Sequence, residues 1–254
     1  MSPIAFSLTA FACILGGMLF GMFLRIFLPE HHLSADSKDV MKLGTGMLAT
    51  LAALVLGLLI ASAKGTFDTM NGGLKQLGSR IILLDRTMAR YGPETREPRD
   101  LLRRDVTSVI KRFWPKEKNA IAVAKAGKPE SRLEDIEEKL RQLSPRNDDQ
   151  RWLQSRALQI TSEIEEARWL LVEQLGESSL PMPFLVILVC WLTIIFTSFG
   201  LLSPRNTTVV AVLFVCALSA ACSLFLILEL DQPYEGLIKI SSVPLSNALA
   251  HLIQ

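Results

Sequence analysis

Histidine and cysteine are scarce in this 254-residue chain, which has three histidines and four cysteines. The sequence contains no HExxH motif, no phosphate-binding loop and no nucleophile motif. The cysteines lie in apolar runs without CxxC or zinc-like spacing, which is typical of small hydrophobic residues: Cys13, Cys190, Cys216 and Cys222. We therefore expect no enzyme, no metal site and no cofactor.

Charge is also scarce, except in one block. Residues 64–181 hold 22 of the 27 Lys and Arg residues and 19 of the 25 Asp and Glu residues, which leaves 5 and 6 for the other 136 positions. The two flanks are too apolar for a simple soluble globular protein. The block mixes both signs and the chain's net charge is only +2, so no basic face indicates nucleic acid as a partner.

Four uncharged segments are long enough to cross a membrane, at residues 4–24, 43–63, 182–202 and 209–228. About 20 residues at about 1.5 Å per residue cover a hydrocarbon core of about 30 Å. Backbone polar groups in lipid need partners within the segment, so these spans should be helices. The first span is not a cleaved signal peptide, because it lacks a positive amino-terminal region and its apolar stretch is too long.

We expect an all-α integral membrane protein with four transmembrane helices and a helical-hairpin domain between spans two and three. Residues 1–63 would hold the first two spans, 64–181 the charged domain, 182–230 the last two spans and 231–254 an amphipathic tail. The tail would lie on the membrane surface or dock on the charged domain. Four spans place both termini and the domain on one side. Basic residues near the membrane ends do not favour either side as cytoplasmic.

Within the charged block, two segments repeat apolar residues at alternating steps of three and four, which predicts coiled helices. Gly92-Pro93 should end the first of these helices, and Asp148 or Asp149 could cap the start of the last. The seams could pair within one chain or between subunits. Their residues are Leu74, Leu77, Ile81, Leu84, Met88 and Tyr91, and Leu153, Ala157, Ile160, Ile164, Ala167 and Leu171.

The second span carries a stripe of small residues beside an apolar ridge. The stripe is Gly46, Thr50, Ala53, Gly57 and Ala61, and the ridge is Met47, Leu51, Leu54 and Leu58. Gly17 and Gly21 form a shorter stripe in the first span. Small residues let membrane helices approach closely, so the stripe either packs a tight four-helix bundle or lets the span crowd a symmetry axis. In the second case the ridge would line a pore and form a constriction that gates by dewetting.

Ionisable residues flank the spans. Lys42, Lys64, Glu229 and Asp231 lie at span ends, where they would either line the mouths of a pore or anchor the helices. His31 and His32 titrate near physiological pH, so the pair would either sense protons or be an exposed interfacial pair.

Several stretches of the sequence resemble a bacterial bestrophin-like membrane family of unknown function, and the resemblance covers nearly the whole chain. The stretches are Leu28-Pro29-Glu30-His31-His32-Leu33, residues 42–46, 49–59 and 61–64, Leu83-Leu84-Asp85-Arg86, Tyr91-Gly92-Pro93-Glu94, and residues 230–236. The bestrophins to which the family's label refers are pentameric anion channels with a helical cytosolic region between their second and third spans.

The resemblance implies a homo-oligomer, with five copies in the bestrophin manner, in the lipid of a bacterial inner membrane. It also implies a pore lined by the second span, an anion such as chloride as the permeating ion, and a cytoplasmic 64–181 domain. Two features depart from bestrophins. The second span lacks their aromatic neck, since it has no Phe until Phe67, which lies past its end. Glu229, Asp231 and Glu235 only loosely match their calcium-binding cluster.

We therefore predict an oligomeric ion channel. A non-conducting scaffold or signalling protein, which would recruit a partner through its helical domain, is the alternative. A transporter is less favoured, because no span carries a mid-membrane charge or a central proline.

Overall fold

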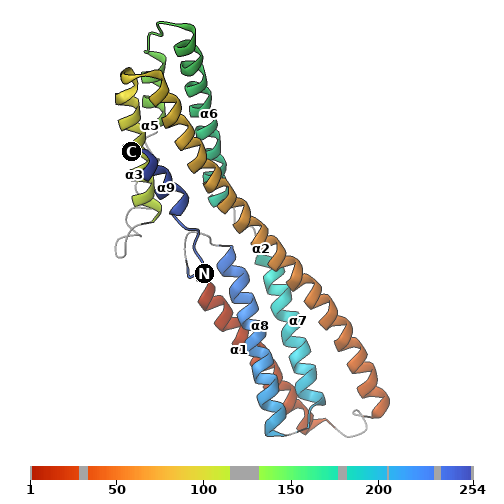
Figure 1. Ribbon diagram of the computed structural model, residues 1–254. Helices are drawn as coiled ribbons and strands as arrows, with labels where there is room; N and C mark the ends of the chain where they lie inside the picture. Colours follow the sequence, from red (N-terminus) through yellow and green to blue (C-terminus); the bar gives the residue numbers. More distant parts are fainter. Residues whose placement is uncertain are drawn as a thin grey trace. The chain divides into compact units, whose positions relative to one another are not determined.

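The computed structural model describes residues 2–28, 34–114, 132–176, 182–204, 206–231 and 236–252, and these residues form helices and turns with no strand among them. Four helices are long and apolar enough to cross a membrane, which confirms the all-α membrane fold. They are α1 (Pro3–Phe27), α2 (Ala35–Tyr91), α7 (Met182–Leu202) and α8 (Thr207–Leu230) (Figure 1). The other helices described are η2 (Pro93–Thr95), α3 (Arg96–Phe113), α5 (Arg132–Arg141), α6 (Asp148–Gly176) and α9 (Val243–Leu252).

The second span and the first helix of the charged block form one continuous helix, α2, of 57 residues. Its sequence contains no proline, so nothing removes a backbone hydrogen bond along its length. It ends at the predicted position, because Gly92 adopts a positive φ of 136° and Pro93 follows. The Thr95 hydroxyl shares its hydrogen between the carbonyl oxygens of Met88 (2.6 Å) and Gly92 (2.8 Å). These carbonyl groups at the end of the helix thereby gain a hydrogen-bond partner.

The chain divides into two compact units. The first comprises Met1–Phe67 and Ser178–Ile238, and the second comprises Asp68–Glu177 and Lys239–Gln254. The first unit contains the four candidate spans, with α2 contributing its amino-terminal part, and the second contains the charged helices together with α9.

Within the first unit, α1 packs on both α7 and α8. Its contact with α7 is close enough to exclude side chains: a Cβ added at Gly21 would overlap the carbonyl of Thr197, and one at Gly200 would overlap the carbonyl of Met18. Gly17 lies against Thr193 in the same way. Residues that come later in α1 contact residues that come later in α7, so the two helices run parallel. The close-packing pattern of Gly17 and Gly21 is thereby confirmed.

In the second unit the residues of the two predicted seams are buried within one chain, except Ala167, which is half-buried. The carboxy-terminal part of α2 runs antiparallel to α6, as three contacts in order along the pair show. Gly73 lies against Leu171, Arg80 Nη1 donates to the Glu163 carbonyl (2.8 Å), and Gln150 Nε2 donates to the Tyr91 carbonyl (3.0 Å). Of the two alternatives for the seams, pairing within the chain is the one observed.

Two details at the ends of helices complete this unit. The cap of α6 is Asn147, whose Oδ1 accepts the backbone N–H of Gln150 (2.7 Å), so the expected cap at Asp148 or Asp149 is wrong by one or two residues. The tail docks on the charged domain, since α9 packs on α3 and lies against Gly78 of α2 through Pro244.

The crossing of α1 and α7 yields a direct test. A G200A substitution places a methyl group on the α1 backbone, and we expect it to cost about 1–3 kcal/mol because the two helices must move apart. The midpoint of thermal unfolding in detergent measures the loss. G16A is the matched control, because nothing lies within 4 Å of an added Cβ there. Equal effects of the two substitutions would contradict the described crossing.

Candidate functional site

The membrane part of α2 has one face in the core of its unit and one face outside it. Ala52, Leu59 and Ala63 are buried in a hydrophobic cluster with residues of α1, α7 and α8. The four ridge residues lie on the other face, with 71% of Met47, 47% of Leu51, 71% of Leu54 and 70% of Leu58 exposed. The ridge therefore makes little contact within the chain.

The small-residue stripe lies on the same outer face as the ridge. Gly46, Thr50, Ala53, Gly57 and Ala61 are all exposed. Nothing lies within 4 Å of a Cβ added at Gly46 or Gly57, in contrast to the tight contacts of Gly21. The Thr50 hydroxyl donates only to the carbonyl of Gly46 in its own helix, at 2.9 Å. Among the described residues, no helix of the same chain packs on this stripe.

The predicted mouth charges differ in their surroundings. Lys42 is exposed and forms an ion pair with Asp39, with 3.0 Å between Nζ and Oδ1. The ammonium of Lys64, which is also exposed, lies 5.4 Å from the centre of the Phe67 ring, within cation–π range. Asp231 is half-buried at the carboxy-terminal cap of α8.

Glu229 is the exception, because only 2% of it is exposed. Its carboxylate accepts the backbone N–H groups of Leu237 and of Ile238, the latter at 3.2 Å. Gly236, at a φ of 98°, lies against the same carboxylate where a Cβ would overlap it. Glu229 thus binds the backbone at Leu237 and Ile238, a role that the sequence analysis missed. The signal was a carboxylate ending an apolar helix a few residues before a glycine.

His31 and His32 lie outside the described residues. No group of three or more His, Cys, Asp and Glu side chains in the described parts of the chain could hold a metal ion.

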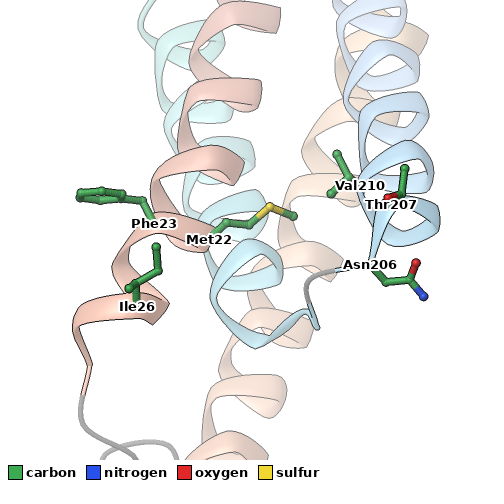
Figure 2. Close-up of a pocket in the computed structure, with 6 residues that line it drawn as sticks. All are labelled: Met22, Phe23, Ile26, Asn206, Thr207 and Val210. Carbon is green, nitrogen blue, oxygen red and sulfur yellow. The ribbon is translucent and has the colours of Figure 1, made fainter.

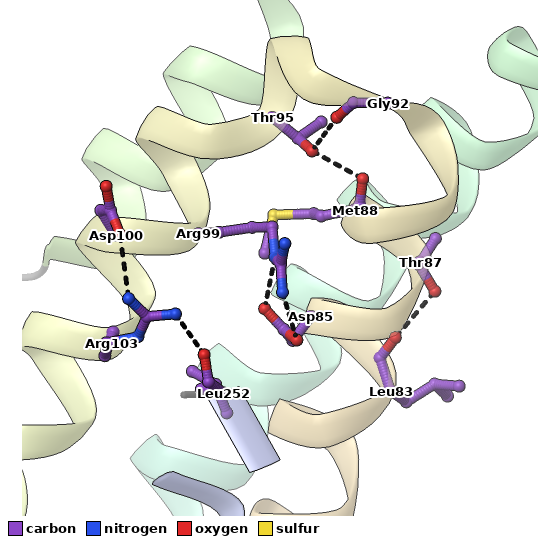
Figure 3. A network of polar contacts seen from close by, with 10 residues as sticks. All are labelled: Leu83, Asp85, Thr87, Met88, Gly92, Thr95, Arg99, Asp100, Arg103 and Leu252. Atoms are coloured by element: carbon purple, nitrogen blue, oxygen red, sulfur yellow. Dashed lines mark hydrogen bonds and ion pairs between the residues drawn. The ribbon is translucent and has the colours of Figure 1, made fainter. Parts of the chain in front are cut away.

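The helical domain is held by ion pairs with buried carboxylates as well as by its seams, and Figure 3 shows the pair of Asp85 and Arg99. Asp85 on α2 accepts two hydrogen bonds from Arg99 on α3, from Nε at 2.7 Å and from Nη2 at 3.0 Å. These bonds raise the pKa of Arg99, although burial acts in the opposite direction. A bidentate Arg–carboxylate pair constrains the relative orientation of its two partners as well as stabilising the fold. It therefore holds α2 and α3 at a defined angle.

A second set of polar contacts attaches α3 to α6 and to the tail. Buried Asp105 accepts a hydrogen bond from Arg168 Nη1 on α6 at 2.8 Å. Arg103 donates to the carbonyl of Leu252 at the end of α9 (Figure 3), and Trp114 Nε1 donates to the carbonyl of Ile240 at 2.8 Å. The carboxy-terminal segment is therefore an integral part of the domain.

Comparison with known protein families identifies the family of this chain. The family model described as "Bestrophin-like domain" matches residues 11–245. The chain belongs to the bestrophin-like family. No curated protein matches this bestrophin-like sequence.

Solved structures of the same fold support the assignment. Two mutant crystal structures of a bacterial bestrophin homologue from Klebsiella pneumoniae resemble the chain at 14% sequence identity each. One has a TM-score of 0.61 with 97% of both chains covered, and the other has 0.56 with 94% of this chain and 97% of that chain covered. Family and fold together support a bestrophin-type membrane channel in general terms.

The electrostatics of the helical domain give a pH-dependent prediction. Burial raises the pKa of Glu165, and the charges of Glu137 and Glu134 raise it further, while Arg168 lowers it. A carboxyl group with a raised folded pKa binds its proton more tightly in the fold. It therefore stabilises the fold below its unfolded pKa of about 4.3, and this stability is lost as pH rises through the folded pKa.

We expect E165Q to raise the thermal midpoint of the bestrophin-like protein at neutral pH, because it removes the unfavourable charge. The gain should disappear below about pH 4, where the wild-type carboxyl is protonated. Thermal unfolding in detergent at both pH values measures this. E166Q, which changes an exposed neighbour, should have little effect at either pH. A gain for E165Q that is independent of pH would contradict the mechanism.

Proposed function

We propose that this protein is an oligomeric ion channel of the bestrophin type, in which several copies surround a shared axis and α2 faces that axis. Membership of the family and the likeness of fold support the general class. The exposed outer face of α2 is the observation that carries the assignment of the pore helix.

Two properties of this face favour an axial position. The most apolar window of α2 is only 17% buried within the chain, against 22% to 33% for the other three spans. Membrane helices gain no hydrophobic energy by associating in lipid, so they associate through the close backbone approach that small residues allow. A stripe of such residues would gain no packing energy if it faced lipid, whereas it would let neighbouring copies of α2 approach closely.

The ridge beside the stripe would then form the narrow part of the pore. Leu51, Leu54 and Leu58 are exposed and apolar, so a ring of them would make a constriction that empties of water when narrow. Exposed Lys42 and Lys64 lie before and after the ridge, and rings of lysine would favour anions such as chloride. Glu229 is less suited to a pore mouth than these lysines, because it is buried and binds backbone N–H groups.

We place the channel in a bacterial inner membrane with the helical domain on the cytoplasmic side, following the family. His31 and His32 remain candidates for a proton sensor on the opposite side.

The first test of this proposal is stoichiometry. The full-length protein in mild detergent should have the native mass of several chains, and we expect five. Light scattering or native mass spectrometry measures it. A G57L substitution fills the small-residue stripe and should lower that mass, whereas V215L, at an exposed position of α8, should not. A wild-type monomer would contradict the proposal and favour a scaffold.

The second test concerns the ridge. L54A and L58A widen the proposed constriction and should each raise the leak conductance of the reconstituted channel severalfold, because a wider apolar ring stays wet. Currents across planar bilayers measure this. L19A provides the control, since Leu19 is an exposed leucine of α1 away from the ridge. Unchanged conductance in both ridge variants would show that α2 does not face the pore in this way.

A further inference from the structure

A hollow of about 490 Å³ opens in the first unit, where α1 ends and α8 begins (Figure 2). Met22, Phe23 and Ile26 line it from the last turns of α1. Asn206, Thr207 and Val210 line it from the start of α8. Its volume lies within the range of about 300–1,000 Å³ that is usual for small-molecule sites.

Near the hollow, the closest backbone contacts of α1 are with α7. Gly17 and Gly21 bring the α1 backbone onto α7. Farther from the hollow, α1 and α8 do fill the space between them, with the rings of Phe11 and Phe214 meeting edge to face at 5.6 Å. The α1–α8 pair is therefore filled near Phe11 and Phe214 and open where α1 ends and α8 begins.

The wall of the hollow has two chemical parts. The apolar part consists of four side chains from the two helices: Met22, Phe23, Ile26 and Val210. The polar part, at the start of α8, is the amide of Asn206 and the hydroxyl of Thr207. About half of Phe23 (55%) and of Ile26 (56%) is exposed, on helices that cross the membrane. The mouth of the hollow is therefore open along α1, whose length and apolar composition suit the hydrocarbon core of a membrane.

The polar end of the hollow also favours negative charge. Arg25 does not line the hollow but precedes Ile26 in α1, and its guanidinium donates to the carbonyl of Ser203, just before the start of α8. The amino terminus of the 24-residue helix α8 adds the partial positive charge of its first N–H groups, with Asn206 as cap. None of the residues that line the hollow is acidic.

We propose that this hollow is a binding site for an anionic glycerophospholipid. One acyl chain lies against Met22, Phe23, Ile26 and Val210, and the phosphate lies near Arg25 and the start of α8. Two features favour this occupant: the apolar wall lies on helices long and apolar enough to cross a membrane, and positive charge lies where α1 ends and α8 begins. The site does not depend on ion conduction by the protein.

The test fills the hollow and measures retained lipid. Val210 lines the hollow, whereas Val212 is exposed on the same helix outside it. We expect V210W to weaken binding of phosphatidylglycerol by at least about tenfold, equivalent to about 1.4 kcal/mol, and V212W to leave it unchanged. Native mass spectrometry of the full-length protein, titrated with phosphatidylglycerol in detergent, measures this. I26W fills the hollow from the α1 wall and should act like V210W, even if one variant folds poorly.

A second comparison tests the charge. R25Q should reduce the preference for phosphatidylglycerol over phosphatidylcholine while leaving phosphatidylcholine binding nearly unchanged. Equal lipid retention by wild type, V210W and I26W would overturn the proposal. So would a loss of oligomer mass in V210W without a change in lipid bound per chain, because a neighbouring copy would then occupy the hollow. Neither result would bear on whether the protein conducts ions.

Discussion

Helices in lipid gain nothing from burying apolar surface against each other, and this constraint governs the membrane part of the protein. Contact between α1 and α7 is therefore made by backbone atoms, at Gly17, Gly21 and Gly200, where added side chains would collide with the partner helix. The same constraint explains why the exposed small residues of α2 are informative. They are the kind of surface that holds spans together, and the chain itself leaves them unused.

The helical domain follows the opposite rule. Heptad seams bury leucine and isoleucine between the end of α2 and α6, as the hydrophobic effect favours in water. Charged side chains then fix angles and order, with Asp85 and Asp105 each buried and bound to an arginine of another helix. Buried carboxylates of this kind stabilise the fold only while their partners stay in place, because an unpaired buried charge costs about 3–5 kcal/mol. The tail is tied into the same network through Arg103 and Trp114.

Sequence patterns predicted the parts of this fold that depend on repetition. Charge-free windows located the spans, the steps of three and four located the seams, and Gly92-Pro93 located the end of α2, because each pattern reports a local backbone or burial preference. Contacts between distant residues carry no such pattern. The buried role of Glu229 depends on the backbone N–H groups of Leu237 and Ile238, and the choice of Asn147 as cap rather than Asp148 depends on one residue of register.

The candidate site divides in the same way. Periodicity found the ridge and the stripe and placed them on neighbouring faces of one helix, which the structure reproduces as a single exposed surface. It could not distinguish a face turned to lipid from one turned to another subunit, since both are exposed in one chain. The hollow between α1 and α8 gave no sequence signal, because the residues that line it come from two helices far apart in the sequence.

The glycines of the second span carry a consequence for folding. In helices of soluble proteins each interior glycine costs about 0.5–1 kcal/mol relative to alanine, because more backbone freedom is lost. Gly44, Gly46 and Gly57 all lie within α2 and have open space where a Cβ would be. A solitary chain would thus bear an entropic penalty in this helix with no compensating contact. Close approach of an adjoining helix at these glycines would supply contacts that offset the penalty.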